Sequence, residues 1–349
     1  MPVMSSNDIL SRIAEACNRY DIDVLERHGA IRAAHEHSLE CIERVRSQII
    51  KQPPSPQCNI DMLAIAGSIA RLEASSNSDL DLIITTTLCE DGAADSGTAI
   101  AWRNELCATL DMDAPNKKGV FSKPVCRSHI EKIAGEAGEH YDTVAKRALL
   151  VLESQWVYNE TNYTSLLHGI IEAYSQDVRA DHAKNFVFLL NDMTRYFRAL
   201  CVNYQFTKSA TEYGKWPIRN IKLRHSRVLM YFSMVAAIGS LSDEQSAEKV
   251  EALSQLIRAQ PLKRLYVAYA LAGDGGFDAF AICYDRFLSS LAMRSVRAEL
   301  EGLEYEKRYD STHFAELKDN SDQLSKELLR FYETRRNQWD PRFFEYMII

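Results

Sequence analysis

The feature that most constrains the fold is a pair of aspartates that alternates with leucines. Asp79, Leu80, Asp81 and Leu82 follow one another at the start of the apolar, β-branched run LDLIITTT (80–87). Because side chains i and i+2 of a strand project from the same face, the two carboxylates would point to one side and the two leucines to the other. The alternation predicts a strand that packs its leucines in the core and presents both carboxylates together.

A Gly-Ser pair precedes the aspartates and follows a second short apolar run, MLAIA (62–66). Gly67 would let the backbone approach a phosphate closely, and Ser68 would add a hydroxyl and amide donors at the start of a short helix, where the helix dipole favours anions. Arg71, one turn later, would face the same side. We therefore expect Gly67, Ser68 and Arg71 to bind the phosphates of a nucleotide.

Two parallel carboxylates repel each other unless a cation lies between them. Mg²⁺ suits Asp79 and Asp81 because it prefers hard oxygen ligands, takes one or two carboxylates and fills its remaining positions with water and phosphate oxygens. In a site with two such ions, the pair would orient an attacking hydroxyl and stabilise a pyrophosphate leaving group. The alternative is a solvated Asp-X-Asp turn, but the ordered set of strand, Gly-Ser, ten-residue gap and alternating aspartates favours the metal site.

The stretch AGSIARLEASSNSDLDLI (66–83) resembles the signature of the DNA polymerase β-type nucleotidyltransferase superfamily, in which an apolar residue and Gly-Ser are followed, after a short gap, by Asp-apolar-Asp-apolar. The resemblance implies that these positions hold the triphosphate and two catalytic Mg²⁺ ions. It also implies a third carboxylate on a later strand. Asp113 is our candidate, and Asp111 and Glu131 are alternatives, although each could instead cap or solvate a helix end. Without a third carboxylate the site would use two.

Strand-like segments are confined to residues 59–125. Residues 6–51 have helical spacing, SGTAIAWRNELCATL (96–110) begins with a helix cap, GVFSKPV (119–125) could form a further strand, and amphipathic helices continue from Asp142 almost to the end. With the resemblance, the fold class is α+β: a small polymerase β-like nucleotidyltransferase α/β domain with a larger all-helical C-terminal domain. The predicted domains are N-terminal helices at 1–57, a nucleotidyltransferase catalytic domain at 58–140, a helical nucleotide-binding domain at 141–320, and a C-terminal helix and tail at 321–349.

The helical part of the chain carries a basic cluster in KWPIRNIKLRHSRVLMYFS (215–233). Cations gathered near one helix start need counter-anions, and lysine and arginine side chains suit phosphate oxygens. We expect them to clamp the β- and γ-phosphates of a nucleotide while an aromatic ring stacks on the base. The alternative is a solvated face paired with Asp192 and Glu212. The predicted nucleotide-binding residues of this part are Arg195, Arg219, Lys222, Arg224, Arg227 and Tyr231.

The segments LLVLES, NDMTRYFR and KWPIRNIKLRHSR are similar to stretches of bacterial stand-alone nucleotidyltransferases, and through them the chain resembles the Hailong anti-phage defence group. That resemblance implies template-independent synthesis of short DNA oligomers from deoxy-ATP as a defence signal. It also implies a C-terminal tyrosine as primer and a single-stranded DNA product that restrains a membrane channel partner. Tyr346 in QWDPRFFEYMII (338–349) is the candidate primer. The alternative is that this tail packs on the helical domain, with Tyr346 as part of the packing.

Targeting signals and cysteine usage bound the location of the protein. The N-terminus lacks the basic and apolar regions of a signal peptide, and the longest apolar stretch (228–239) is well short of the roughly 20 residues that span a bilayer. Eight scattered cysteines without a C-x-x-C pair indicate reduced thiols rather than a zinc cluster or disulfide framework. We expect a cytoplasmic protein without direct membrane insertion, which could form a homo-oligomer if Tyr346 reaches a neighbouring active site.

Two further interpretations of the function stay open. One is the transfer of a single nucleotide to a protein or small molecule, as regulatory and toxin members of the superfamily do. The other is a catalytically inactive nucleotide-sensing module, which the uncertain third carboxylate motivates. The net charge of −7 opposes extensive coating by nucleic acid, although a local basic groove can still bind phosphates.

Overall fold

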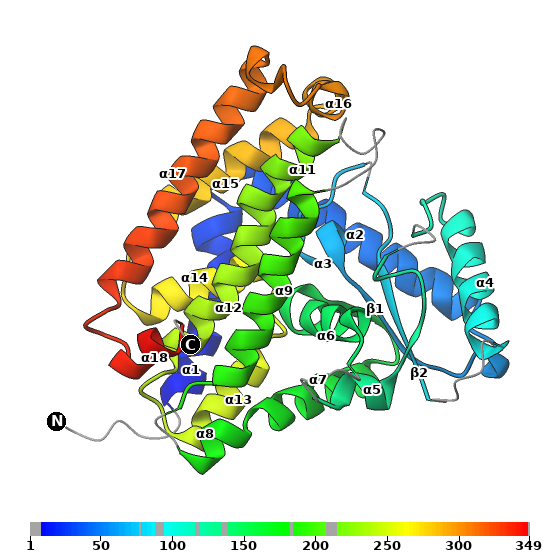
Figure 1. Cartoon of the computed structure of the whole chain (residues 1–349), viewed down its shortest axis with the longest axis horizontal. Helices are drawn as coiled ribbons and strands as arrows, with labels where there is room; N and C mark the ends of the chain where they lie inside the picture. The colour runs from blue at the N-terminus through cyan, green and yellow to red at the C-terminus, as the bar shows by residue number, and fades with distance from the viewer. Residues whose placement is uncertain are drawn as a thin grey trace. The chain divides into compact units, whose positions relative to one another are not determined.

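The computed structural model describes residues 8–76, 78–87, 94–115, 119–133, 139–181, 184–206 and 215–347 (Figure 1). The chain divides into two compact units. The first, the sheet unit, is His35–Gln176, and the second, the helical unit, combines the described parts of Met1–Ala34 and Asp177–Ile349. The sheet unit mixes strands with helices, whereas the described part of the helical unit is built from helices, so the expected combination of α and β structure is confirmed.

The sheet unit is organised around one four-stranded sheet. Its strands are β1 (Ile60–Ile65), β2 (Leu82–Thr86), β3 (Val125–Cys126) and β4 (Gln155–Tyr158). Their order across the sheet is β3-β2-β1-β4. β1 pairs antiparallel with both β2 and β4, whereas β2 and β3 run parallel. The end of β1 therefore lies beside the start of β2.

Helices cover both faces of this sheet. They are α2 (Gly29–Lys51, from His35 on), α3 (Gly67–Ala70), α4 (Ala94–Thr109), α5 (Arg127–Glu131), α6 (Tyr141–Glu153) and α7 (Glu160–Tyr174). Alternate strand residues, among them Leu63, Leu82 and Ile84, form a core with α2 and α4. Met62, which alternates with these residues along β1, is also fully buried. Helix α7 contacts β1 as well. The period-two alternation of a strand thus places buried side chains on both faces of the sheet.

Two predictions about strands are corrected. The expected strand at 119–125 is mostly a turn, in which the Ser122 N–H donates to the Gly119 carbonyl at 3.1 Å, and only its last residue enters β3. The segment QWVY, expected to continue a helix, forms the edge strand β4. Helix α6 ends at Glu153. The aromatic and β-branched residues that follow suit the pleated edge of a sheet better than a helix.

The boundaries between the units fall at residues 34 and 176, whereas the sequence placed domain boundaries at 57, 140 and 320. Strand β4 pairs with β1, so residues 141–176 belong with the sheet although most of them are helical. Helix α2 supplies Ile42, Val45 and Ile49 to the core on one face of the sheet. The end of the N-terminal helical region therefore joins the sheet unit as well.

An apolar helix, α12 (Val228–Ser240), organises the helical unit, because most of its side chains are buried and it packs against α14, α9 and α13. No helix within the described ranges is both long and apolar enough to cross a lipid bilayer. The other helices of this unit are α1 (Asp8–Tyr20), α8 (Gln176–Ala180, which begins at the boundary), α9 (Val187–Gln205), α11 (Trp216–Lys222), α13 (Ser246–Leu256), α14 (Pro261–Leu271), α15 (Phe277–Ala292), α16 (Arg294–Gly302), α17 (Thr312–Thr334) and α18 (Pro341–Tyr346).

The cysteines differ at one position from the expected set of reduced thiols. Cys126 is disulfide-bonded, so the expectation of eight free thiols is wrong at that residue. Cys89 lies outside the described residues. The free thiols of the described residues are Cys17, Cys41, Cys58, Cys107, Cys201 and Cys283.

Candidate functional site

The edge of the sheet at which β1 ends and β2 begins brings the Gly-Ser pair and the aspartates together. The Ala66 N–H donates to the Asp81 carbonyl at 2.8 Å, which extends the antiparallel ladder one step past the regular strands. The predicted alternation is confirmed, because Leu80 and Leu82 are buried while Asp79 is exposed and Asp81 is half-buried. The aspartates themselves lie just before β2 rather than inside it.

Gly67 occupies a position that a larger residue could take only with rearrangement. Its φ of +73° lies in the left-handed region, which residues with a Cβ rarely adopt. A Cβ built there would lie 2.6 Å from Oδ2 of Asp81. The missing side chain therefore lets the Asp81 carboxylate lie directly against the backbone of the turn.

Ser68 ties the turn to the loop that leads to the aspartates. It follows Gly67 in the short helix α3. Its hydroxyl donates to Oγ of Ser78 at 3.1 Å, and the Ser75 N–H donates to the same oxygen at 3.0 Å. Because Ser78 directly precedes Asp79, these bonds position the start of the alternating segment relative to the Gly-Ser pair.

Arg71 lies in a buried ion-pair cluster with Glu73 and Glu153, which we call the Arg71 cluster. Its Nη1 donates to Oε2 of Glu153 at 2.7 Å, and its Nε donates to Oε2 of Glu73 at 3.0 Å. The three side chains are at most 5% exposed. The other oxygen of Glu153, Oε1, accepts the Gly67 N–H at 3.0 Å. The sequence predicts a phosphate contact for Arg71, whereas the structure gives its guanidinium two carboxylates, one of which also holds the turn.

Glu153 is the residue of this region that sequence reasoning missed. It is the last residue of α6, stands 86 positions after Gly67 in the chain, and is buried. The available signal is a glutamate that closes the apolar run ALLVLE, because a buried carboxylate needs a cation or N–H donors. That signal indicates that Glu153 has a partner, but it does not identify the partner.

The candidates for a third carboxylate are not part of the strands. Asp111 and Asp113 are exposed in the turn after α4, and Glu131 ends α5 and pairs with Arg127 at 2.8 Å. Among the described residues, no group of three His, Cys, Asp or Glu side chains is placed to hold one metal ion. The two carboxylates of the alternating segment still fit Mg²⁺, because this ion takes one or two carboxylates and completes its shell with water and phosphate oxygens.

The predicted basic residues of the helical unit gather where α11 continues through a π-helical turn (Leu223–Arg227) into α12. This junction contacts α9, which carries Arg195. Arg224 pairs with Asp322 of α17, and Arg195 pairs with Asp192 at 3.3 Å. The structure thus brings these cations into one region and gives two of them carboxylate partners. The junction also carries three half-buried cations, which are Arg219, Lys222 and Arg227.

Tyr231, the predicted base-stacking residue, is itself stacked on a neighbouring ring. Its ring lies parallel to that of Phe197, with centroids 4.7 Å apart and planes inclined by 3°. Its hydroxyl forms a hydrogen bond with the Thr194 hydroxyl at 3.0 Å. A base that stacked on Tyr231 would therefore use the other face of the ring.

The tail docks on the helical unit through Phe343 and leaves Tyr346 half-buried. Phe343 is fully buried and packs edge-to-face on Trp339, with centroids 5.2 Å apart. Burial raises the pKa of Tyr346, and the nearby charge of Arg342 lowers it in part. The packing predicted for the tail is confirmed for Phe343, while the Tyr346 phenol stays partly accessible. Residues 348 and 349 lie outside the described chain.

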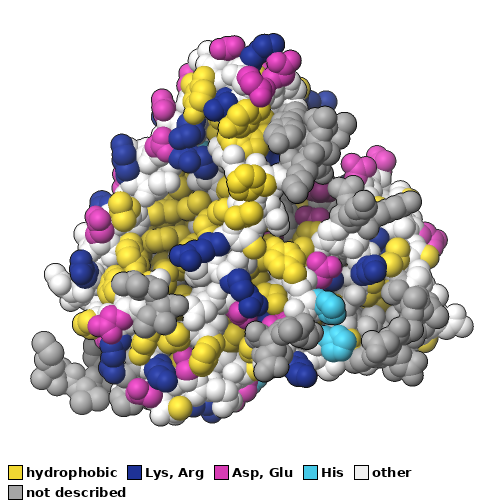
Figure 2. All heavy atoms as spheres, in the orientation of Figure 1, with side chains coloured by type: hydrophobic (Ala, Val, Ile, Leu, Met, Phe, Trp, Pro, Cys, Tyr) yellow, Lys and Arg dark blue, Asp and Glu magenta, His cyan; other side chains and the backbone are white. Residues whose placement is uncertain are grey.

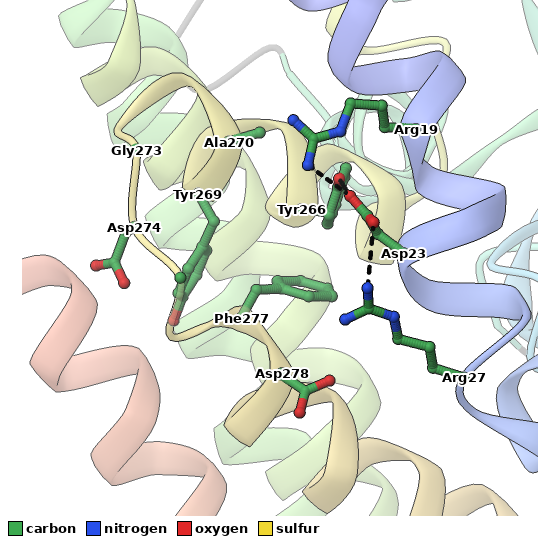
Figure 3. Close-up of a pocket in the computed structure, with 11 residues that line it drawn as sticks. Arg19, Asp23, Arg27, Tyr266, Tyr269, Ala270, Gly273, Asp274, Phe277 and Asp278 are labelled. Carbon is green, nitrogen blue, oxygen red and sulfur yellow. Dashed lines mark hydrogen bonds and ion pairs between the residues drawn. The ribbon is translucent and has the colours of Figure 1, made fainter.

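A cavity of about 330 Å³ lies within the helical unit, between the end of α1, α14 and the start of α15 (Figure 3). Asp23 at its wall accepts the Tyr266 hydroxyl and pairs with Arg19 at 3.0 Å and Arg27 at 3.6 Å. The Tyr266 hydrogen bond is the main cause that lowers the pKa of Asp23, and burial raises the pKa of Tyr266 to about 12. These groups satisfy one another, and the residues that line the cavity include none of those predicted to bind a nucleotide.

Comparisons with family models, with curated proteins and with solved structures each found no match. The function is therefore inferred from the residues of this chain and their geometry.

Proposed function

We propose that this chain is a Mg²⁺-dependent nucleotidyltransferase whose reaction centre is the sheet edge that carries Gly67, Ser68, Asp79 and Asp81. The observation that supports this most is the close approach of the Asp81 carboxylate to the left-handed Gly67 turn. A turn without a side chain also lets a phosphate approach the same backbone. A cation held by the carboxylates would then contact phosphate oxygens directly.

Each residue of this edge has a role in the proposed reaction. Bound Mg²⁺ would neutralise charge on the phosphates and the leaving group. Asp79 and Asp81 would hold it, the missing side chain of Gly67 leaves room for the Asp81 carboxylate beside the turn, and Ser68 offers a hydroxyl. The oxygen of an acceptor hydroxyl attacks the α-phosphorus, the bond to the bridging oxygen of pyrophosphate breaks, and the hydroxyl proton passes to water.

The proposed product is a short DNA oligomer made from deoxy-ATP without a template, and the proposed acceptor at the start is Tyr346. The resemblance to the Hailong group supports both, together with the proposed action of the product on a membrane channel. Burial raises the pKa of the Tyr346 phenol, so the hydroxyl is protonated at neutral pH and needs activation before it can attack. The alternative acceptor is another protein or a small molecule, which would receive one nucleotide.

Incubation of the chain with each labelled ribo- and deoxynucleoside triphosphate and Mg²⁺ tests the proposal. A ladder of products indicates polymerisation, and a single shifted protein band indicates modification. Asp81→Asn should abolish both, whereas Asp319→Asn, at an exposed aspartate of α17, is the matched control and should leave them unchanged. Full activity in Asp79→Asn and in Asp81→Asn would refute the site.

The tail is tested by intact mass measurement of the peptide that contains Tyr346. The proposed primer predicts a nucleotide adduct on this peptide and none in Tyr346→Phe. An active enzyme that never carries an adduct there would remove Tyr346 from the proposal and leave the nucleotidyltransferase assignment standing.

A second candidate is a nucleotide-sensing module without turnover. The observation that favours it is that the described residues offer no three-carboxylate metal group. Titration calorimetry would then show nucleotide binding without release of pyrophosphate. Substitution of both Asp79 and Asp81 by alanine would leave the biological activity intact, and loss of that activity would reject this candidate.

A further inference from the structure

Half-buried aromatic side chains and exposed arginines share one surface of the helical unit, which we call the aromatic–arginine surface. Figure 2 shows hydrophobic side chains gathered over α9, α12 and α17, with Lys and Arg side chains among them. The residues that define the surface are Phe197 and Arg198 of α9, Tyr231 and Phe232 of α12, Tyr332 of α17 and Arg336 of the turn that follows α17.

The rings of this surface lie close to one another across three helices. Phe197 and Tyr231 stack with centroids 4.7 Å apart, and Phe232 meets Tyr332 edge-to-face at 6.2 Å. The Tyr332 ring in turn lies 5.1 Å from that of Phe344 in α18. The aromatic contacts therefore continue from α9 to the tail helix.

These rings differ from the aromatic core of the same unit. Phe331 and Phe343 are fully buried, whereas Phe232, Tyr332 and Phe344 are all half-buried. A half-buried ring keeps part of its π-face open to solvent, where another planar group can stack on it.

The arginines of the surface have no acidic partner in the part of the chain that the structure describes. Arg198 and Arg336 are exposed, and neither guanidinium forms an ion pair or a side-chain hydrogen bond with the described residues. Each lies near a tyrosine of the surface: burial raises the pKa of Tyr231 and of Tyr332, and the charges of Arg198 and Arg336, respectively, lower these pKa values in part. The surface thus combines stacking rings with positive charge that the described residues do not neutralise.

We infer that the aromatic–arginine surface binds single-stranded nucleic acid. Exposed bases stack on aromatic faces, and arginines without carboxylate partners neutralise the phosphates between them. A duplex would fit poorly, because its bases are already stacked on each other. The inference rests on the proposed function only where it identifies the ligand with the oligomer product, and it is tested without any synthesis.

Fluorescence anisotropy with a labelled oligodeoxyadenylate, in EDTA and over a series of salt concentrations, tests the inference. Arg198→Glu with Arg336→Glu should weaken binding by at least about tenfold and reduce the slope of log affinity against log salt by about 1.4, since each phosphate contact on a single strand contributes about 0.7. The matched control is Arg258→Glu with Arg294→Glu, two exposed arginines of the same unit, which should bind as the wild type does.

The stacking component has its own variants. Tyr332→Ala should weaken binding roughly 5- to 160-fold, which corresponds to the loss of one base-stacking contact, whereas Tyr332→Phe should keep the wild-type affinity. Circular dichroism confirms that each variant is folded. An RNA oligomer of the same sequence separates a surface for DNA from one for either nucleic acid.

Three results would overturn the inference. The first is equal affinity of the wild type and the charge-reversed variant, and the second is equal affinity for single strand and duplex. The third is light scattering in which the charge reversal converts a dimer to a monomer, because this face would then be a contact between copies of the chain. The variant Asp81→Asn separates a failure of this inference from a failure of the proposed function. Oligomer binding that persists in an inactive chain supports the surface, whatever the wild type proves to synthesise.

Discussion

The Gly67 turn and the π-helical turn of the helical unit satisfy their buried polar groups in opposite ways. Next to the Gly67 turn, Arg71 is buried as an ion between two carboxylates. In the π-helical turn, His225 is equally buried but is a neutral imidazole, which donates from Nδ1 to the Ile221 carbonyl at 2.8 Å and accepts at Nε2 from Asn320 at 3.1 Å. Burial lowers the pKa of His225 to about 4.

The two turns differ in whether a positively charged side chain is buried beside them. A buried cation needs counter-charge in the same place, because transfer of an unpaired ion out of water costs several kcal/mol. The Arg71 cluster therefore uses its arginine internally, to orient Glu153 toward the Gly67 N–H. The neutral His225 needs no counter-charge, since a carbonyl and an amide satisfy its ring, and the neighbouring Arg224 and Arg227 are half-buried.

Loss of the buried cation should have the largest effect on stability. Arg71→Met leaves Glu73 and Glu153 buried without their cation, and removal of one partner from a buried pair destabilises by about 3–5 kcal/mol. Urea unfolding measures this change in the free energy of unfolding. Arg32→Met, at an exposed arginine, should change it by less than about 0.5 kcal/mol. A loss below about 1 kcal/mol in Arg71→Met would show that the cluster is open to water.

The neutral histidine predicts a dependence of stability on pH. Since the folded pKa of His225 lies near 4, below the unfolded value of about 6.5, its contribution is complete above pH 6.5 and is lost as the pH falls toward 4. The shift corresponds to at most about 3 kcal/mol. Urea unfolding at pH 7.5 and at pH 4.5 measures it.

The matched variants isolate this residue from the other titrating groups. His225→Gln keeps hydrogen-bonding groups but cannot titrate, so the stability of this variant should depend less on pH. His129→Gln, at an exposed histidine of the sheet unit, should keep the wild-type dependence. The same pH dependence in all three proteins would contradict the neutral, buried histidine.

A side chain at position 67 should lower the stability less than the loss of Arg71 does, but it should also lower the activity. Gly67→Ala forces a Cβ into the left-handed region, at about 1–2 kcal/mol, and displaces the Asp81 carboxylate. Nucleotidyl transfer should fall at least about tenfold, because the carboxylate moves from its position. Gly97→Ala is the control, since a Cβ there meets nothing within 4 Å and alanine favours the helix. Equal activity in both variants would remove the turn from the site.

Sequence predicted the local features of this site and missed those that depend on distant partners. The burial of Leu80 and Leu82 follows from a period of two along the chain, whereas at Gly67 the sequence predicts the close approach of a phosphate and not of the Asp81 carboxylate. The partner of Arg71 could not be predicted, because Glu153 lies 82 positions away, at the end of the helix that leads into β4. Nearest-neighbour spacing decides which face a side chain takes, whereas packing decides what it meets there.

The smallest expected effect comes from a partly exposed ion pair within α9, in which the side chain of Asp192 is 15% exposed. Arg195 and Asp192 lie 3.3 Å apart at the surface of α9, and the arginine side chain is 50% exposed. Such pairs contribute about 0.2–1 kcal/mol, so Arg195→Gln should lower the free energy of unfolding by no more than this, and the effect should vanish in 1 M salt. A double-mutant cycle with Asp192→Asn measures the coupling. A coupling above 2 kcal/mol would mean that the junction also fixes its cations in place, as the Arg71 cluster does, and would end the contrast between the two turns.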